Sequence, residues 1–200
     1  MFVRTESLSQ FIRFYPVVSA LVVIHAVVFI LTSLPGGLGD QFLRMMMGAN
    51  FLISDGEWWR LILPIFAHGG IGHVLFNTFS LVLFAPALER IAGHFHFIVI
   101  YMLSGIIANV ATWMIQPPMY LSVGASGAIF GLFGVYAAIL FIYKERAPAE
   151  LKQILLPILV ISVIMTFFGA NINITAHIAG LLAGFFIGMF VFQSRGQSAR

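Results

Sequence analysis

Long apolar runs alternate with short polar segments along most of the chain. An α-helix needs about 20 apolar residues to cross a bilayer, and six runs approach or reach this length. They cover residues 15–34, 74–88, 95–115, 126–143, 151–169 and 176–192. The second run is short, so its helix is expected to begin near Gly70 or Ile71. Because lipid offers the backbone no hydrogen-bond partners, each run is predicted to be a transmembrane helix.

The segment between the first two runs, residues 35–66, follows a different pattern. It mixes Gly, Asp, Gln and Arg with short apolar stretches, and it contains Trp58 and Trp59. Tryptophan is enriched where a membrane meets water. The pattern therefore predicts a long ordered loop that lies on or in one membrane interface.

Composition supports a membrane protein of the all-α polytopic class. Hydrophobic residues make up 60% of the 200 residues and charged residues only 8%, whereas a soluble domain has about 25% charged residues. Cysteine is absent, which excludes disulfides and cysteine metal sites. The net charge of +3 comes from a few basic residues, and their placement explains them better than nucleic-acid binding does.

The basic residues favour one side of the predicted bundle. Arg44 and Arg60 fall on the side of the long loop, and the other eight fall on the side of the two termini. By the positive-inside rule, both termini are predicted to be cytoplasmic. The predicted division is a cytoplasmic segment over residues 1–14, a six-helix core over 15–192 and a cytoplasmic tail over 193–200. The small size and the lack of organelle-targeting features favour a bacterial cytoplasmic membrane.

Four polar residues inside the predicted helices stand out, since polar groups at membrane depth are costly and commonly functional. They are His73 and Asn77 in the second helix, Ser126 in the fourth and His177 in the sixth. At 1.5 Å per residue, all four lie roughly 18 to 27 Å above the cytoplasmic ends of their helices. In a hydrocarbon core about 30 Å thick, three different helices thus bring them to a similar depth.

These four residues have the chemistry needed for acyl transfer. Ser126 begins its helix, where free backbone N–H groups stabilise a developing negative charge. His177 is the candidate general base that would take the proton of Ser126. His73 and Asn77 share one helix face. Together with the Ser126 N–H, they are the candidate oxyanion hole.

Two further patterns concern how these groups are held. Small residues recur on the fourth and sixth helices and predict that the two helices pack closely; they are Gly127, Gly131, Gly134, Gly180 and Gly184. Asn171 and Asn173 are candidate caps for the start of the sixth helix.

All seven acidic residues lie outside the predicted helices. A Ser–His dyad is therefore expected, with His177 oriented by packing or by neutral groups.

Four motifs, taken in order from residue 57 to residue 184, resemble those of the rhomboid intramembrane proteases. Glu-Trp-Trp-Arg at 57–60 resembles the loop-one motif of that family, and His-Gly-Gly-Ile-Gly-His-Val-Leu-Phe-Asn at 68–77 resembles its second-helix motif. Gly-Ala-Ser-Gly at 124–127 resembles its nucleophile motif, and Ala-His-Ile-Ala-Gly-Leu-Leu-Ala-Gly at 176–184 its sixth-helix motif.

The resemblance implies a six-helix bundle with Ser126 as nucleophile and His177 as base. It also implies an oxyanion hole made of His73, Asn77 and the Ser126 N–H. Supporting positions are implied for Gly124, Gly127, Phe130, Gly180, Gly184, Trp59 and Arg60. Family members often carry a tyrosine four residues after the serine, stacked on the catalytic histidine. Phe130 stands there, so the stacking is expected without the hydroxyl. Arg60 is expected to fix the loop or to meet lipid phosphates.

The prediction is a serine endopeptidase that cleaves peptide bonds in or near transmembrane segments through an acyl-enzyme. Its expected partners are transmembrane protein substrates and membrane lipids, with no nucleic acid, cofactor or metal. One alternative is a non-catalytic relative that binds membrane helices, although this chain keeps both Ser126 and His177. A second alternative is a small transporter that uses His73 and His177 as a proton relay. The absence of acidic residues from the predicted helices argues against it. The natural substrate and the oligomeric state stay open.

Overall fold

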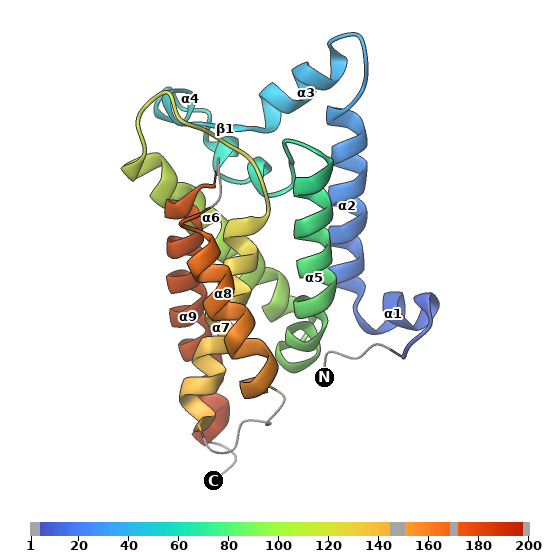
Figure 1. Ribbon diagram of the computed structural model, residues 1–200, viewed down its shortest axis with the longest axis vertical. Coiled ribbons are helices and arrows are strands. Elements are labelled where there is room, and N and C mark those ends of the chain that lie inside the picture. The colour runs from blue at the N-terminus through green and yellow to red at the C-terminus, as the bar shows by residue number, and fades with distance from the viewer. Residues whose placement is uncertain (1–4, 145–150, 169–171, 198–200) are drawn as a thin grey trace.

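A computed structural model describes residues 5–144, 151–168 and 172–197, and helices build most of it. The described chain forms a helical bundle of the polytopic membrane type (Figure 1). Its apolar helices take the six predicted places: α2 (Pro16–Thr32), α5 (Ile71–Ala92), α6 (His94–Ile115), α7 (Ser126–Tyr143), α8 (Leu156–Met165) and α9 (Ile174–Gln197). The predicted start of the second helix at Ile71 and of the fourth at Ser126 is confirmed.

The helices differ in how well their length suits a membrane. Four of them, α5, α6, α7 and α9, are long and apolar enough to cross a bilayer. A short helix α1 (Leu8–Phe14) meets α2 at a bend of 110°, and this pair qualifies as one broken span. The fifth helix, α8, is shorter than predicted and follows a π-helical turn, Leu151–Leu155. Pro157 lacks the N–H that a helix interior needs, so the regular α-helix begins directly before it.

The long segment between α2 and α5 is ordered, as predicted. It contains α3 (Leu38–Met46), α4 (Asn50–Ser54) and two 3-10 turns, Trp58–Leu61 and Leu63–Ile65. A two-residue strand, β1 (Gly48–Ala49), pairs antiparallel with β2 (Leu121–Ser122), which precedes α7. The segment therefore lies across one end of the bundle and is joined to the turn that leads into α7 (Figure 1).

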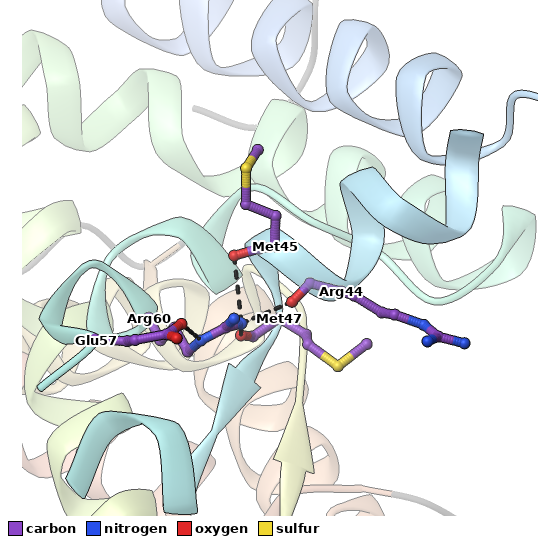
Figure 2. A network of polar contacts seen from close by, with 5 residues as sticks. All are labelled: Arg44, Met45, Met47, Glu57 and Arg60. Carbon is purple, nitrogen blue, oxygen red and sulfur yellow. Dashed lines mark hydrogen bonds and ion pairs between the residues drawn. The ribbon is translucent and has the colours of Figure 1, made fainter. Parts of the chain in front are cut away.

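Arg60 holds this segment together (Figure 2). Its side chain is buried, and its Nη1 donates to the carbonyl oxygens of Arg44 at 2.7 Å and Met47 at 2.8 Å. Its Nε forms an ion pair with Glu57 at 2.6 Å. The last carbonyls of a helix have no partner within the helix. The guanidinium of Arg60 satisfies those at the end of α3 and thus fixes the loop, whereas the neighbouring Trp59 is exposed.

A buried carboxylate joins α2 to α5 at the opposite end of the bundle. Glu89 is 0% exposed and accepts the backbone N–H groups of Val17 and Val18, both at 2.9 Å. The first N–H groups of a helix have no partner within the helix, and their dipoles favour a negative charge. The hydrophobic pattern predicts that Glu89 lies in a loop after the second helix. It belongs to α5 instead and caps the start of α2.

The core of the bundle is built around α7. Every residue from Gly127 to Tyr136 is buried. On the side of α9 the two backbones touch, because a Cβ at Gly180 would overlap the carbonyl of Gly127, and one at Gly184 would overlap the carbonyl of Gly131. The predicted close packing of these two helices through small residues is confirmed.

Three histidine rings form a row between α2, the end of the long loop and α5. The ring centroids of His25 and His68 are 5.0 Å apart, and those of His68 and His73 are 5.1 Å apart, both in edge-to-face geometry. His25 and His68 are buried. In the part of the chain that the structure describes, Nδ1 of His25 and both ring nitrogens of His68 are buried without a hydrogen-bond partner of good geometry. The row carries the packing of the loop onto the first turn of α5.

The contact between α7 and α9 predicts a severe effect of one added methyl group. Gly184→Ala would push the two backbones apart and should lower the free energy of unfolding by about 1–3 kcal/mol. Thermal unfolding in detergent would measure the loss. Gly72→Ala is the matched control, because a Cβ at that helical glycine meets nothing within 4 Å. Equal stability of the two variants would contradict the close contact.

The histidine row predicts that acid weakens the loop. Burial, and to a lesser extent the charges of His25 and His73, lower the pKa of His68 from 6.5 to about 3, although the Phe66 backbone acts in the opposite direction. Between pH 6.5 and pH 3 the imidazole of His68 binds a proton more tightly in the unfolded chain than in the folded one. Its contribution to the free energy of unfolding is therefore fully present above about pH 6.5 and falls below it.

At about pH 5 the loss from His68 should reach about 2 kcal/mol, measured as thermal stability against the value near pH 7.5. His68→Phe keeps an aromatic ring in the row but does not titrate, so its stability should depend less on pH. If the wild type and His68→Phe lost the same stability on acidification, His68 would not be the group responsible.

Candidate active site

Three helices begin at the same end of the bundle, next to α3 and α4 (Figure 1). Each carries a predicted site residue at or near its start: His73 is the third residue of α5, Ser126 the first of α7 and His177 the fourth of α9. Helix starts present free N–H groups and a partial positive charge. Their convergence creates a site that favours negative charge.

A glycine turn places Ser126 at the first position of α7. The N–H of Gly124 donates to the carbonyl of Pro64 at 2.9 Å, which ties the turn to the long loop. Gly124 has φ +125°, a conformation that side-chain-bearing residues rarely adopt. The turn leaves Ser126 half-buried at the head of its helix.

His73 lies directly against this turn. A Cβ added to Gly124 would stand 2.6 Å from Nε2 of His73, so only glycine leaves room for the imidazole. One turn further along α5, Asn77 is buried and its amide donates to the carbonyl of His73 at 3.0 Å. The structure thus brings His73 to the backbone beside Ser126, and it keeps Asn77 on the same helix next to His73.

His177 is held by contacts from two other helices. Its ring stacks on Phe130 of α7, with centroids 4.0 Å apart and an angle of 15° between the planes. Its Nδ1 lies 2.9 Å from the hydroxyl of Thr166, the residue that ends α8. The stacking that was expected for Phe130 is confirmed. Since Phe130 follows Ser126 by one helical turn, the stack holds the imidazole on the face of α7 that carries the serine.

The start of α9 is fixed by hydrogen bonds to α6. The side-chain oxygen of Asn173 accepts the N–H of Ala176 at 2.9 Å, which confirms it as the cap of the helix. The amide of the same Asn173 donates to Thr112 of α6 at 2.9 Å, and Gln116 donates to Thr175 at 2.7 Å. Asn171, the other candidate cap, lies outside the described residues. The cap and its partners position the first turn of α9, and with it His177.

One predicted partnership is incomplete in this structure. Within the described ranges, the Ser126 hydroxyl and the His177 imidazole form no direct hydrogen bond. Catalytic hydrogen bonds are commonly long or poorly aligned without substrate. Ser126 and His177 therefore belong to one candidate site, although no hydrogen bond joins their side chains in this structure.

A cavity lies beside Ser126 on the side of α6. Its lining includes the polar side chains of Asn109, Ser122 and Asn173. Among the described residues, no group of three or more His, Cys, Asp or Glu side chains is arranged to hold a metal ion, and this includes the histidine row. The site consists of a hydroxyl, imidazoles, amides and backbone N–H groups.

Two contacts of the site do not follow from the sequence alone. Thr166 is one of several hydroxyl residues inside the apolar runs, so the sequence does not single it out. A polar residue inside a predicted membrane helix is nevertheless a signal of function. The sequence favours a packing or interfacial role for His25, and its contact with His68 appears only when α2 and the loop are placed in space. Neither contact follows from spacing along the chain.

Comparison with known proteins gives the family of this chain. Residues 55–194 match the Rhomboid domain. The chain is 43% identical over 195 residues to YdcA of Bacillus subtilis, provisionally named a rhomboid protease, and the match covers 98% of both chains. It is 39% identical over 170 residues to the rhomboid protease GluP of the same organism, and this match covers 82% of this chain and 32% of GluP. RHOMBOID-like protein 5 of Arabidopsis thaliana is 36% identical over 151 residues, 73% of this chain and 48% of that protein. The chain belongs to the rhomboid family of intramembrane serine proteases.

Proposed function

We propose that this protein hydrolyses peptide bonds of transmembrane proteins with Ser126 as nucleophile and His177 as general base. The observation that carries the proposal is the stack of His177 on Phe130, one helical turn below Ser126. This stack supports the proposal because it holds an imidazole on the face of α7 that carries Ser126. The free N–H groups at the start of the same helix favour the anion that would form. Burial of His177 shields its imidazole from bulk water.

The reaction follows from these roles in two halves. The Ser126 oxygen attacks the substrate carbonyl while His177 takes the hydroxyl proton, and a tetrahedral oxyanion forms. His177 then gives this proton to the leaving amine, and the acyl-enzyme remains. A water molecule next attacks the ester with His177 again as base, and the acid product and free Ser126 are released.

The oxyanion is proposed to lie between α5 and α7. The Ser126 N–H belongs to the first turn of α7, His73 lies against the Gly124 backbone, and Asn77 follows one turn along α5. Donors that are already oriented stabilise the transition state without reorganising. One N–H of the Asn77 amide donates to the backbone carbonyl of His73, which fixes the amide against α5. The cavity next to Ser126, which Asn109 and Asn173 help to line, is the proposed site of the hydrolytic water.

The substrate is proposed to be a transmembrane segment that unwinds near the end of the bundle formed by the long loop. An intact helix keeps its carbonyls in hydrogen bonds, so helix-breaking residues near the cut favour cleavage. We place this end of the bundle outside the cell and residues 1–14 and 193–200 in the cytoplasm. A bacterial cytoplasmic membrane fits this orientation and the eight basic residues on the opposite side. Lipids would surround residues 15–192.

The dyad is tested by two substitutions at the site. Ser126→Ala and His177→Ala should each abolish cleavage of a model transmembrane substrate in liposomes, while both variants still unfold cooperatively on heating in detergent. A fluorophosphonate, which reacts with activated serines, should label the wild type and not Ser126→Ala.

Phosphonate labelling also separates the rival functions. Cleavage that persists in purified Ser126→Ala would show that Ser126 is not the nucleophile. A wild type that neither cleaves several substrates nor takes the label would favour a helix-binding role, and proton-linked transport that survives Ser126→Ala would favour a transporter.

The oxyanion hole predicts a loss in kcat rather than in binding. Asn77→Ala removes one donor and should lower kcat by about 100-fold, while KM changes little because the oxyanion exists only in the transition state. Steady-state kinetics on the model substrate would measure both constants. A rise in KM with an unchanged kcat would instead place Asn77 in substrate binding.

A further inference from the structure

The hydroxyl of Thr166 makes two contacts within hydrogen-bond distance. One is to the carbonyl oxygen of Ser162, one turn earlier in α8, at 2.9 Å. The other is to Nδ1 of His177, also at 2.9 Å. Thr166 is 2% exposed, so neither contact competes with bulk water. The hydroxyl therefore lies between a backbone acceptor and the imidazole of the proposed base.

Apolar packing holds α8 only in part. Ile158, Leu159 and Val163 are half-buried against the core, and no residue of α8 from Leu156 to Met165 is fully buried. The two residues that flank this stretch, Leu155 and Thr166, are buried. A loosely packed helix is thus anchored at its far end by a polar side chain, and the partner of this side chain is His177.

The number of hydrogen bonds that the Thr166 hydroxyl can form indicates which ring nitrogen of His177 carries the hydrogen. A hydroxyl donates one hydrogen bond and accepts others, and the Ser162 carbonyl is only an acceptor. If Thr166 donates to Ser162, it accepts from an Nδ1–H of His177, and both contacts are hydrogen bonds. If Thr166 donated to a bare Nδ1, its contact with Ser162 would be lost. The first arrangement uses more hydrogen bonds and is favoured inside the protein.

We propose that Thr166 is a positioning residue that holds His177 in the tautomer with hydrogen on Nδ1. Nε2 then carries the lone pair and can accept the proton of Ser126. A serine hydrolase commonly uses a buried carboxylate for this purpose, and here a neutral hydroxyl on α8 takes its place. The inference deepens the proposed function and rests on it. It adds a fourth helix to the three that supply the reacting groups.

Matched substitutions isolate the hydroxyl. Thr166→Val keeps the shape of the side chain and removes the hydroxyl, and Thr166→Ser keeps the hydroxyl. Thr32→Val is the control, because Thr32 ends α2 and its hydroxyl likewise donates to a carbonyl of its own helix, that of Phe29 at 3.1 Å. All variants would be purified as full chains and compared by thermal unfolding and by cleavage of the model substrate.

Thr166→Val should lower kcat by about 10- to 100-fold, the effect of one hydrogen bond to a group that becomes charged in the transition state. KM should change little. Thr166→Ser should restore most of kcat, and Thr32→Val should cleave like the wild type. A wild-type kcat in folded Thr166→Val, or equal losses in Thr166→Val and Thr166→Ser, would overturn the proposal.

Nitrogen-15 NMR of histidine-labelled protein in detergent measures the tautomer directly. The signals of His177 are assigned by their absence in His177→Ala. In the wild type they should show hydrogen on Nδ1, and in Thr166→Val they should show a mixture of tautomers. Hydrogen on Nε2 in the wild type would overturn the proposal even if Thr166→Val did not fold. Since the tautomer is measured without substrate, this result is independent of whether Ser126→Ala abolishes cleavage.

Discussion

The backbone contact between α7 and α9 is the constraint on which the rest of the structure depends. Gly127 and Gly131 meet Gly180 and Gly184 without any intervening side chain. In lipid, where apolar surface gains little by burial against another helix, such close van der Waals packing is a main source of helix association. The same contact is a condition for the proposed dyad, because a serine at the start of one helix can reach a histidine in the first turns of another only if their axes are close.

The polar ends of the helices are held by groups from distant parts of the chain. Arg60 donates to the carbonyls at the end of α3. Glu89 accepts N–H groups at the start of α2, and Asn173 accepts an N–H group at the start of α9. Unpaired backbone groups are costly wherever water is scarce. Each of these side chains therefore fixes the direction in which its helix starts or ends, and the direction of α9 in turn determines where His177 points.

The sequence predicts the elements and the site residues more fully than their contacts. Hydrophobic runs locate α6 and α7 closely, because the length of a membrane helix follows from the bilayer itself. Counting residues from the opposite ends of the three helices, where the basic residues lie, is enough to group His73, Ser126 and His177 at one depth. The shortened α8, the assignment of Glu89 to α5 and the row from His25 to His73 do not follow from the sequence. They depend on how side chains of different helices meet, which spacing within one helix does not encode.

A neutral hydrogen bond to His177, the proposed base, suits a site that lies among apolar membrane helices. A carboxylate beside His177 would be a second ionisable group among apolar helices, and such groups are expensive at membrane depth. The Thr166 hydroxyl has no charge to desolvate, yet it distinguishes the two nitrogens of the imidazole through its fixed contact with Ser162. Stacking on Phe130 restrains the plane of the ring, and the hydroxyl restrains its rotation within that plane. Two neutral contacts thus supply the orientation for which a soluble hydrolase commonly uses an acid.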